Sequence, residues 1–350
     1  MDMSAHPTAR RPLARPAAIA RWLFVVVALI LLMVLVGGIT RLTESGLSIT
    51  EWKPVTGTLP PIGDAAWAEE FARYRQSSQY VLMNQGMTLA AFKHIFFWEY
   101  VHRLLGRVIG LVYALPMLWF FVRRAVPQGQ GPRLILLLIL GGAQGAVGWL
   151  MVKSGLTDRV NVEPAMLAAH LGMALLLMGA VLWTACDMRM LARNSAARPA
   201  RPTLWGAITI ALLFLQLLLG AITAGLRAGY VANTWPLMND HFVPDGIVWW
   251  GNLWLTITSD HYLVHFLHRW WAWGVAVAIM LLAKGLNRAD ARGLAFALAG
   301  GVVAQIMLGI ATVVTGVALP IAVLHQVAGA ALFGLTVAGA HRLGAAKTRA

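Results

Sequence analysis

Residues 22–40 read WLFVVVALILLMVLVGGIT, an apolar run that contains no charged side chain. A helix that crosses the hydrocarbon core of a bilayer needs about 20 mostly apolar residues, and similar stretches follow between polar or Pro/Gly-rich breaks. We expect spanning helices at 22–40, 97–122, 133–152, 164–186, 204–225, 262–283, 293–316 and 320–341. Lipid satisfies backbone polar groups only in helices and closed barrels, and these runs lack the alternation of barrel strands. The predicted fold class is therefore all-α integral membrane, with eight transmembrane helices.

The composition and the charge distribution agree with a membrane location. Of the 350 residues, 59% are hydrophobic and 12% are charged, which is too apolar for an ordinary water-soluble domain. The net charge of +14 would suit nucleic acid, but alternate loops hold most of it. One side has 17 basic residues with Asp2, Asp187 and Asp290, and the other has eight basic and ten acidic residues. The positive-inside rule places both termini in the cytoplasm, and we expect membrane lipid, not nucleic acid, as the partner.

The second half of the chain repeats the first. The matching segments are GGIT (37–40) with GAIT (220–223), EYVHRLLGR (99–107) with HFLHRWWAW (265–273), Gln144 with Gln305, and His170 with His325. Because each half has an even number of helices, this order predicts two pseudo-symmetric four-helix bundles in a parallel repeat. The units are a basic N-terminus (1–21), a first half (22–186), a linker (187–203), a second half (204–341) and a tail (342–350). The long outer loops, 41–96 and 227–261, should fold over the outer ends of the bundles.

Four histidines, His102, His170, His268 and His325, fall inside predicted spans. Each lies roughly five to seven residues from the outer end of its helix, so at 1.5 Å per residue all four share a level near the outer leaflet. Ionisable groups in a bilayer are costly and usually serve a site. Neutral imidazole is a good axial ligand of haem iron, so one pair per half predicts two bis-histidine haem sites. The alternative is that each histidine hydrogen-bonds to a neighbouring helix.

The two halves differ three residues before the first histidine of each pair. Glu99 precedes His102, whereas His265 precedes His268. The i, i+3 spacing puts each pair on one helical face, roughly 5–6 Å apart at Cβ. A carboxylate beside an apolar porphyrin edge is a candidate for proton transfer or for stabilising a carbocation-like intermediate. The alternative is a structural salt bridge between Glu99 and a nearby arginine, Arg103 or Arg107.

Other polar side chains lie close to these positions. Arg103 and Arg269 occupy equivalent places in the repeat and suit haem propionates, although snorkelling to the interface is an equal alternative. Four further histidines are expected at or near the outer surface: His94, His241, His261 and His265. The last two are one turn apart, which makes a surface metal site or a proton relay a further alternative. His6 and His341 lie in the basic cytoplasmic regions and are expected to need no special role. The single cysteine, Cys186, has no partner for a disulfide and is expected to act as a small apolar residue.

The segment GGITRLTESGLSITEWKPVTGTLPP (37–61) resembles the first-helix exit and first outer loop of the haem A synthase family. EYVHRLLGR resembles the second-helix signature of that family, and the four histidines in the second, fourth, sixth and eighth helices complete the pattern. Some bacterial members carry a cysteine pair in the first outer loop. None stands there in this chain, so the resemblance is to the cysteine-free, proteobacterial and mitochondrial-like branch. It implies a multi-pass protein of the bacterial inner membrane, with its haem sites toward the periplasm.

The resemblance also implies an activity. His102 and His170 would flank the substrate, haem O, and His268 and His325 would ligate a haem b cofactor. Glu99 matches a functionally important glutamate of the family. The reaction would oxidise the C8 methyl of haem O to an alcohol and then to a gem-diol, which loses water to give the formyl group of haem A for haem–copper terminal oxidases. Haem O synthase, the farnesyl-adding enzyme, and an unidentified electron acceptor would be partners.

Two other functions are compatible with four intramembrane histidines. A cytochrome b that only transfers electrons would hold two equivalent, permanent haems, but it needs no carboxylate in one half. A haem carrier or transporter would release its haem unchanged, and the pseudo-symmetric repeat alone would permit it. The chemistry of the extracted haem distinguishes these functions from methyl oxidation.

Overall fold

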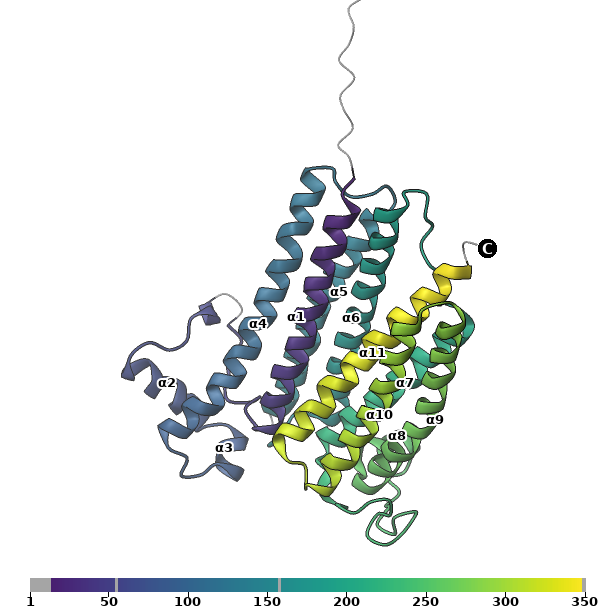
Figure 1. Cartoon of the computed structure of the whole chain (residues 1–350). Coiled ribbons are helices and arrows are strands. Elements are labelled where there is room, and N and C mark those ends of the chain that lie inside the picture. Colours follow the sequence, from purple (N-terminus) through teal and green to yellow (C-terminus); the bar gives the residue numbers. More distant parts are fainter. Residues whose placement is uncertain (1–13, 54–55, 157–158, 348–350) are drawn as a thin grey trace, which may run out of the picture.

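The computed structural model describes residues 14–53, 56–156 and 159–347, and within these ranges it contains helices and no β-strand. Figure 1 shows a bundle of long helices with short helices attached at one end. The elements are α1 (Pro16–Leu42), η1 (Thr56–Thr58), α2 (Asp64–Tyr74), α3 (Ser78–Met83), α4 (Leu89–Val122), α5 (Gly131–Leu156), α6 (Pro164–Arg193), α7 (Leu204–Gly225), η2 (Ala228–Tyr230), α8 (Leu253–Ser259), α9 (His261–Arg288), α10 (Arg292–Val314) and α11 (Leu319–Lys347).

Eight of the described helices are long and apolar enough to cross a membrane: α1, α4, α5, α6, α7, α9, α10 and α11. The prediction of an all-α integral membrane protein with eight spans is confirmed. The bounds of α7 are those expected from the sequence, 204–225. Most other spans run further than their apolar cores, because long basic side chains at an interface permit helix to continue. The largest correction is α4, which begins at Leu89 and not at 97, where Thr88 caps the helix by accepting from the backbone N–H of Ala91 at 3.2 Å.

Helix packing divides the spans into two sets of four. Contacts join α1, α4, α5 and α6 in the first half and α7, α9, α10 and α11 in the second. Between the halves, α1 packs on α11, α6 on α7, and α6 on α11. In the repeat, α1 corresponds to α7 and α6 corresponds to α11. Under this correspondence the α1–α11 contact becomes the α7–α6 contact and the α6–α11 contact is unchanged, as a parallel repeat requires. The contacts between the halves are thus repeated, although α9 packs on α11 in the second half more closely than α4 packs on α6 in the first.

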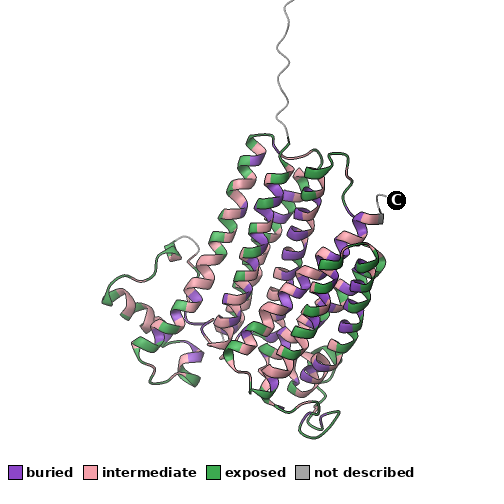
Figure 2. Ribbon diagram, viewed as in Figure 1, coloured by how far each residue is buried: buried purple, intermediate pink, exposed green. Residues whose placement is uncertain are grey.

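Burial follows this arrangement (Figure 2). The central helices α1 and α6 carry many of the fully buried side chains, including Leu23 and Met178. Large apolar side chains on outer helices stay exposed, among them Leu115 on α4 and Phe296 on α10. A contiguous apolar exterior of this kind is what lipid would cover.

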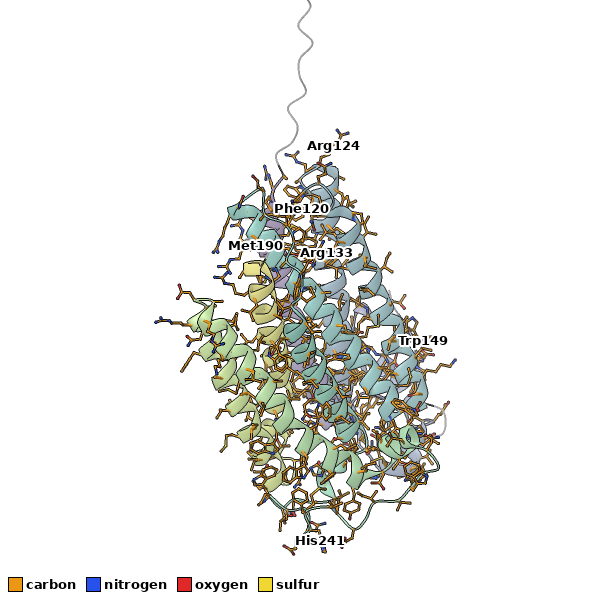
Figure 3. All side chains as sticks on the ribbon, turned by 90° about the vertical axis from the view of Figure 1, so that its right-hand side faces the viewer. Phe120, Arg124, Arg133, Trp149, Met190 and His241 are labelled. Carbon is orange, nitrogen blue, oxygen red and sulfur yellow. The ribbon has the colours of Figure 1, made fainter. Side chains whose placement is uncertain are left out.

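Both described ends of the chain lie at one end of the bundle, here called the termini end, and the opposite end is the loop end (Figure 1). Figure 3 shows Arg133 toward the termini end and His241 at the tip of the loop end. Near the termini end Asp187, 1% exposed, accepts from Arg133 at 2.6 Å and from the backbone N–H of Ala200 at 3.0 Å. His341 contacts the same carboxylate at 2.8 Å. We expected no special role for His341, but it is buried and ties α11 to α6.

The short helices lie at the loop end. Figure 1 shows α2 and α3 at the side of α4, so this part of loop 41–96 does not cover the ends of the bundle as expected. An aromatic cluster of Tyr74, Phe92 and Phe96 attaches them to α4. Burial raises the pKa of the Tyr74 phenol, which therefore stays protonated and donates to Gln79 Oε1 at 2.9 Å.

Candidate functional site

His268 on α9 and His325 on α11 face each other within the second half. Their ring centres are 6.3 Å apart and the ring planes meet at 86°. Two metal–imidazole bonds of about 2 Å each, with roughly 1 Å from each nitrogen to its ring centre, span about 6 Å. This pair is therefore spaced to hold one metal ion between two imidazoles.

His102 on α4 and His170 on α6 make the corresponding pair in the first half. Among the described residues, no group of three or more His, Cys, Asp or Glu side chains could hold a bare metal ion. A metal between two imidazoles would need its other ligands from elsewhere, and a porphyrin supplies four in one plane.

Each of the four imidazoles packs against a glycine of the preceding span. The pairs are His102 with Gly37, His170 with Gly148, His268 with Gly220, and His325 with Gly309. A Cβ atom would come within 2.7 Å of the ring at Gly148 and within 2.8 Å at Gly220, closer than real Cβ contacts. Glycine is needed at these positions because the ring occupies the space that a side chain would fill.

Three of the imidazoles also meet a glutamine four residues before that glycine. The amide nitrogen of Gln144, Gln216 or Gln305 lies 3.2, 3.1 and 3.2 Å from Nδ1 of His170, His268 and His325, and it donates to the carbonyl oxygen of the same histidine at 3.0, 2.9 and 3.0 Å. The amide oxygens of all three glutamines are buried without a hydrogen-bond partner. These amides fix the rings from the side away from the facing histidine.

The unpaired amide oxygens test whether the site fits a haem. An imidazole that binds a metal through Nε2 carries its proton on Nδ1, and that proton usually meets an acceptor. Rotation of each amide would offer its oxygen to Nδ1–H in exchange for the N–H bond to the histidine carbonyl, so metal binding would give a partner to an oxygen that is otherwise buried and unpaired. The residues around His170, His268 and His325 therefore fit binding of haem iron by these imidazoles, and His102 completes the first pair without such an amide.

Glu99 lies one turn before His102 and is 3% exposed. One carboxylate oxygen accepts from Arg103 Nε at 3.0 Å and from its Nη2 at 2.6 Å. The other oxygen accepts from Ser48 Oγ at 2.7 Å and from the backbone N–H of Ile49 at 2.8 Å. The salt bridge with Arg103 that the sequence left open is thus present. The same carboxylate also fastens the segment after α1 to α4.

The second half repeats this fastening with a neutral residue. Arg269 donates its Nε to His265 Nε2 at 3.0 Å, as Arg103 does to Glu99. The remaining guanidinium nitrogens bind loop carbonyls in both halves: Ile49 and Glu51 for Arg103, and Ala232, Thr234 and Leu237 for Arg269. Both arginines therefore hold an outer loop against a histidine-bearing helix, a role that the expected propionate contacts and snorkelling did not include.

The position of His265 differs from the expectation. It is 2% exposed and bonded to Arg269, so it does not lie at the surface, whereas His261, His94 and His241 are exposed. A surface metal site shared by His261 and His265 is therefore wrong. The reason is that Arg269 turns inward to reach the loop carbonyls, and His265 accompanies it.

A charged cavity of about 310 Å³ opens beside Glu99 at the loop end. Its walls include Arg103, Arg107, Tyr100, Lys53 and Glu70. Hydrogen bonding to Glu51 raises the pKa of Lys53, which therefore stays charged. The cavity therefore places charged and polar side chains close to the Glu99–Arg103 pair on the side that faces the loops.

Gln216 and the four glycines that contact the imidazoles were not among the site residues predicted from the sequence. The match of GGIT with GAIT placed Gly37 and Gly220 together, and counting back four residues from Gly220 would have found Gln216. His6, expected to need no special role, lies outside the described residues.

The chain resembles known proteins over nearly its whole length. Residues 20–337 match the sequence model of a family described as cytochrome oxidase assembly protein. Proteins named Heme A synthase are similar throughout. That of Sphingopyxis alaskensis is 55% identical, with 97% of this chain and 95% of the relative aligned. That of Novosphingobium aromaticivorans is 50% identical, with 99% of each chain aligned, and that of Rhodospirillum centenum is 44% identical, with 98% and 93% aligned.

Proposed function

Because the chain belongs to the cytochrome oxidase assembly protein family that includes the haem A synthases, we propose that it oxidises the C8 methyl of haem O to the formyl group of haem A. The observation that carries the proposal is an asymmetry in charge between the two halves. Both halves hold a histidine pair fit for haem, but only the first places a carboxylate, Glu99, one turn from it. Electron transfer alone needs no such difference, whereas a reaction in one half does.

The two halves have different roles: the first binds the substrate and the second binds the cofactor. In the first half, His102 and His170 bind the iron of haem O. In the second half, His268 and His325 would hold a haem b. When bound there, haem b supplies one-electron transfer between the substrate half and an electron acceptor. A glycine behind each of the four imidazoles, and an amide beside three of them, keep these rings in place.

The substrate methyl is hydroxylated first to an alcohol and then to a gem-diol, which loses water to leave the formyl group. With water as the oxygen donor, each hydroxylation releases two protons and two electrons, which pass to the electron acceptor, and positive charge develops on the substrate carbon. Glu99, held by Arg103, Ser48 and Ile49, provides a fixed negative charge for that step and an acceptor for the proton that leaves. Its counterpart His265 offers no negative charge, in keeping with electron transfer in the second half.

The charge distribution supports an orientation. With 17 basic and three acidic residues on the side of the termini, both termini lie in the cytoplasm, and the histidine level lies toward the periplasm of a bacterial inner membrane. Haem O is apolar and farnesylated, so haem O synthase is the enzyme class that supplies it. The product serves the assembly of haem–copper oxidases.

The test is to express the protein with a source of haem O and to analyse the extracted haems by chromatography and mass. The wild type should yield haem A or hydroxylated haem O. Glu99→Ala should keep haem b but yield little haem A, and normal haem A from this variant would remove Glu99 from the mechanism. His268→Ala should lose the b-type spectrum, and an unchanged spectrum would overturn the cofactor assignment. His261→Ala, at an exposed histidine outside both pairs, is the matched control.

A further inference from the structure

The four imidazoles are not held alike. Three have the glutamine described above, but the matching position for His102 is Met33, four residues before Gly37. Met33 faces the same helix as His102, since its Cε lies 3.6 Å from where a Cβ at Gly106, one turn beyond His102, would be. Among the described residues, no hydrogen bond reaches a ring nitrogen of His102. Thioether sulfur is a weak acceptor and cannot replace an amide.

The ring of His102 also presents a different edge. Its Nε2 and Cδ2 atoms are nearest to Gly37, at 3.3 and 3.5 Å from the position of a Cβ there. In the other three pairs the nearest ring atom is Cε1, and Nδ1 follows at 3.2 Å in His170, 3.4 Å in His268 and 3.7 Å in His325. The amides of the three glutamines therefore coincide with one ring orientation, and the imidazole without an amide has turned to another.

Hydrogen bonding at Nδ1 decides how well an imidazole serves as a ligand. An acceptor for Nδ1–H fixes the ring and its tautomer and raises the basicity of Nε2, which strengthens the bond to the metal. A histidine without it must order its ring when it binds and gives a weaker bond. Of the four imidazoles, His102 is thus the one most easily released from iron.

We propose that Gln144, Gln216 and Gln305 are positioning residues that fix the imidazoles of His170, His268 and His325, and that Met33 leaves His102 as a releasable ligand. This inference rests on the proposed function, in which the first half binds haem O. Its substrate haem is then held by one fixed imidazole and one that detaches, as an exchangeable haem requires. The haem b of the second half has two fixed ligands, as a resident cofactor requires.

The experiment compares wild type, Met33→Gln, Met33→Leu and Gln216→Met, each purified in detergent with haem b and loaded with haem O. Transfer of haem O to excess apomyoglobin and binding of CO to the reduced haems are followed optically, and the midpoint potential of haem b is titrated. In the wild type, CO should bind to the haem of the first half and not to haem b. Met33→Gln should slow transfer of haem O and weaken CO binding about fivefold each, the effect of one neutral hydrogen bond. Met33→Leu, of similar volume but without an amide, should match the wild type.

Gln216→Met applies the reverse change in the second half. It should raise the midpoint potential of haem b and let haem b bind CO, because a less basic imidazole stabilises the ferric state less. A structural role alone would alter stability without this shift. The inference is overturned if Met33→Gln and wild type transfer haem O within twofold of each other, or if CO binds both haems of the wild type equally. Failure of the proposed function is distinguishable, since the wild type would then bind no haem O at His102 and His170, and variants of these histidines would retain as much haem O as wild type.

Discussion

Glu99→Gln tests whether one carboxylate holds the segment after α1 against α4. A glutamine keeps the size of the side chain but replaces an acceptor oxygen with a donor, which must then face either Arg103 or the donors of Ser48 and Ile49. At least two charge-assisted hydrogen bonds are weakened or lost, each worth about 1.5–3 kcal/mol. The lower value for both gives about 3 kcal/mol, which is roughly 150-fold in the equilibrium between closed and open loop.

Hydrogen–deuterium exchange with mass spectrometry of a peptide covering 43–52 measures this opening, because the amide of Ile49 is one of the donors. We expect exchange at Ile49 about 100-fold faster in the variant. Glu51→Gln on the same loop is the control: its side chain is 45% exposed in its pair with Lys53, and exposed ion pairs contribute about 0–1 kcal/mol. Its exchange should change less than about fivefold. Equal exchange in wild type and Glu99→Gln would refute the reasoning.

Three further changes test other contacts. Gly148→Ala puts a Cβ 2.7 Å from the ring of His170 and should lower retention of haem O without changing the haem b spectrum, whereas Gly145→Ala, with nothing within 4 Å, should retain haem O like wild type. Equal retention of haem O by the two variants would contradict the requirement for glycine beside His170. Asp187→Asn leaves Arg133 without its counterion and should cost about 3 kcal/mol, seen as a lower melting temperature in detergent; an unchanged melting temperature would contradict a stabilising role. Ser48→Ala removes a single hydroxyl donor to Glu99 and should open the loop less than Glu99→Gln does, and a larger effect would show that the loop depends on the hydroxyl.

Hydropathy was sufficient to predict the spans, because lipid imposes one solution on apolar runs of this length. The histidine pairs were also predictable, since the sequence repeat matches the two histidines of one half with the two histidines of the other. The amide at Gln216 and the bonds from Ser48 and Ile49 to Glu99 were not. The role of Gln216 depends on which helix faces His268, and the bonds of Ser48 and Ile49 depend on the course of an irregular loop. Neither helix packing nor the course of a loop gives a periodic signal in the sequence. The contact between His341 and Asp187 joins residues 154 positions apart and has the same cause.

Arg103 and Arg269 each hold an outer loop and donate their Nε–H to the side chain one turn earlier in the helix. The partner is a carboxylate oxygen of Glu99 in the first half and an imidazole nitrogen of His265 in the second, because both groups can accept this hydrogen bond. The two halves therefore differ in formal charge at this one position, Glu99 in the first and His265 in the second, while the same arginine contact holds the outer loop in each. A change of charge at this turn thus leaves the attachment of the loop intact, so the chemistry of one half can differ from that of the other within the same framework.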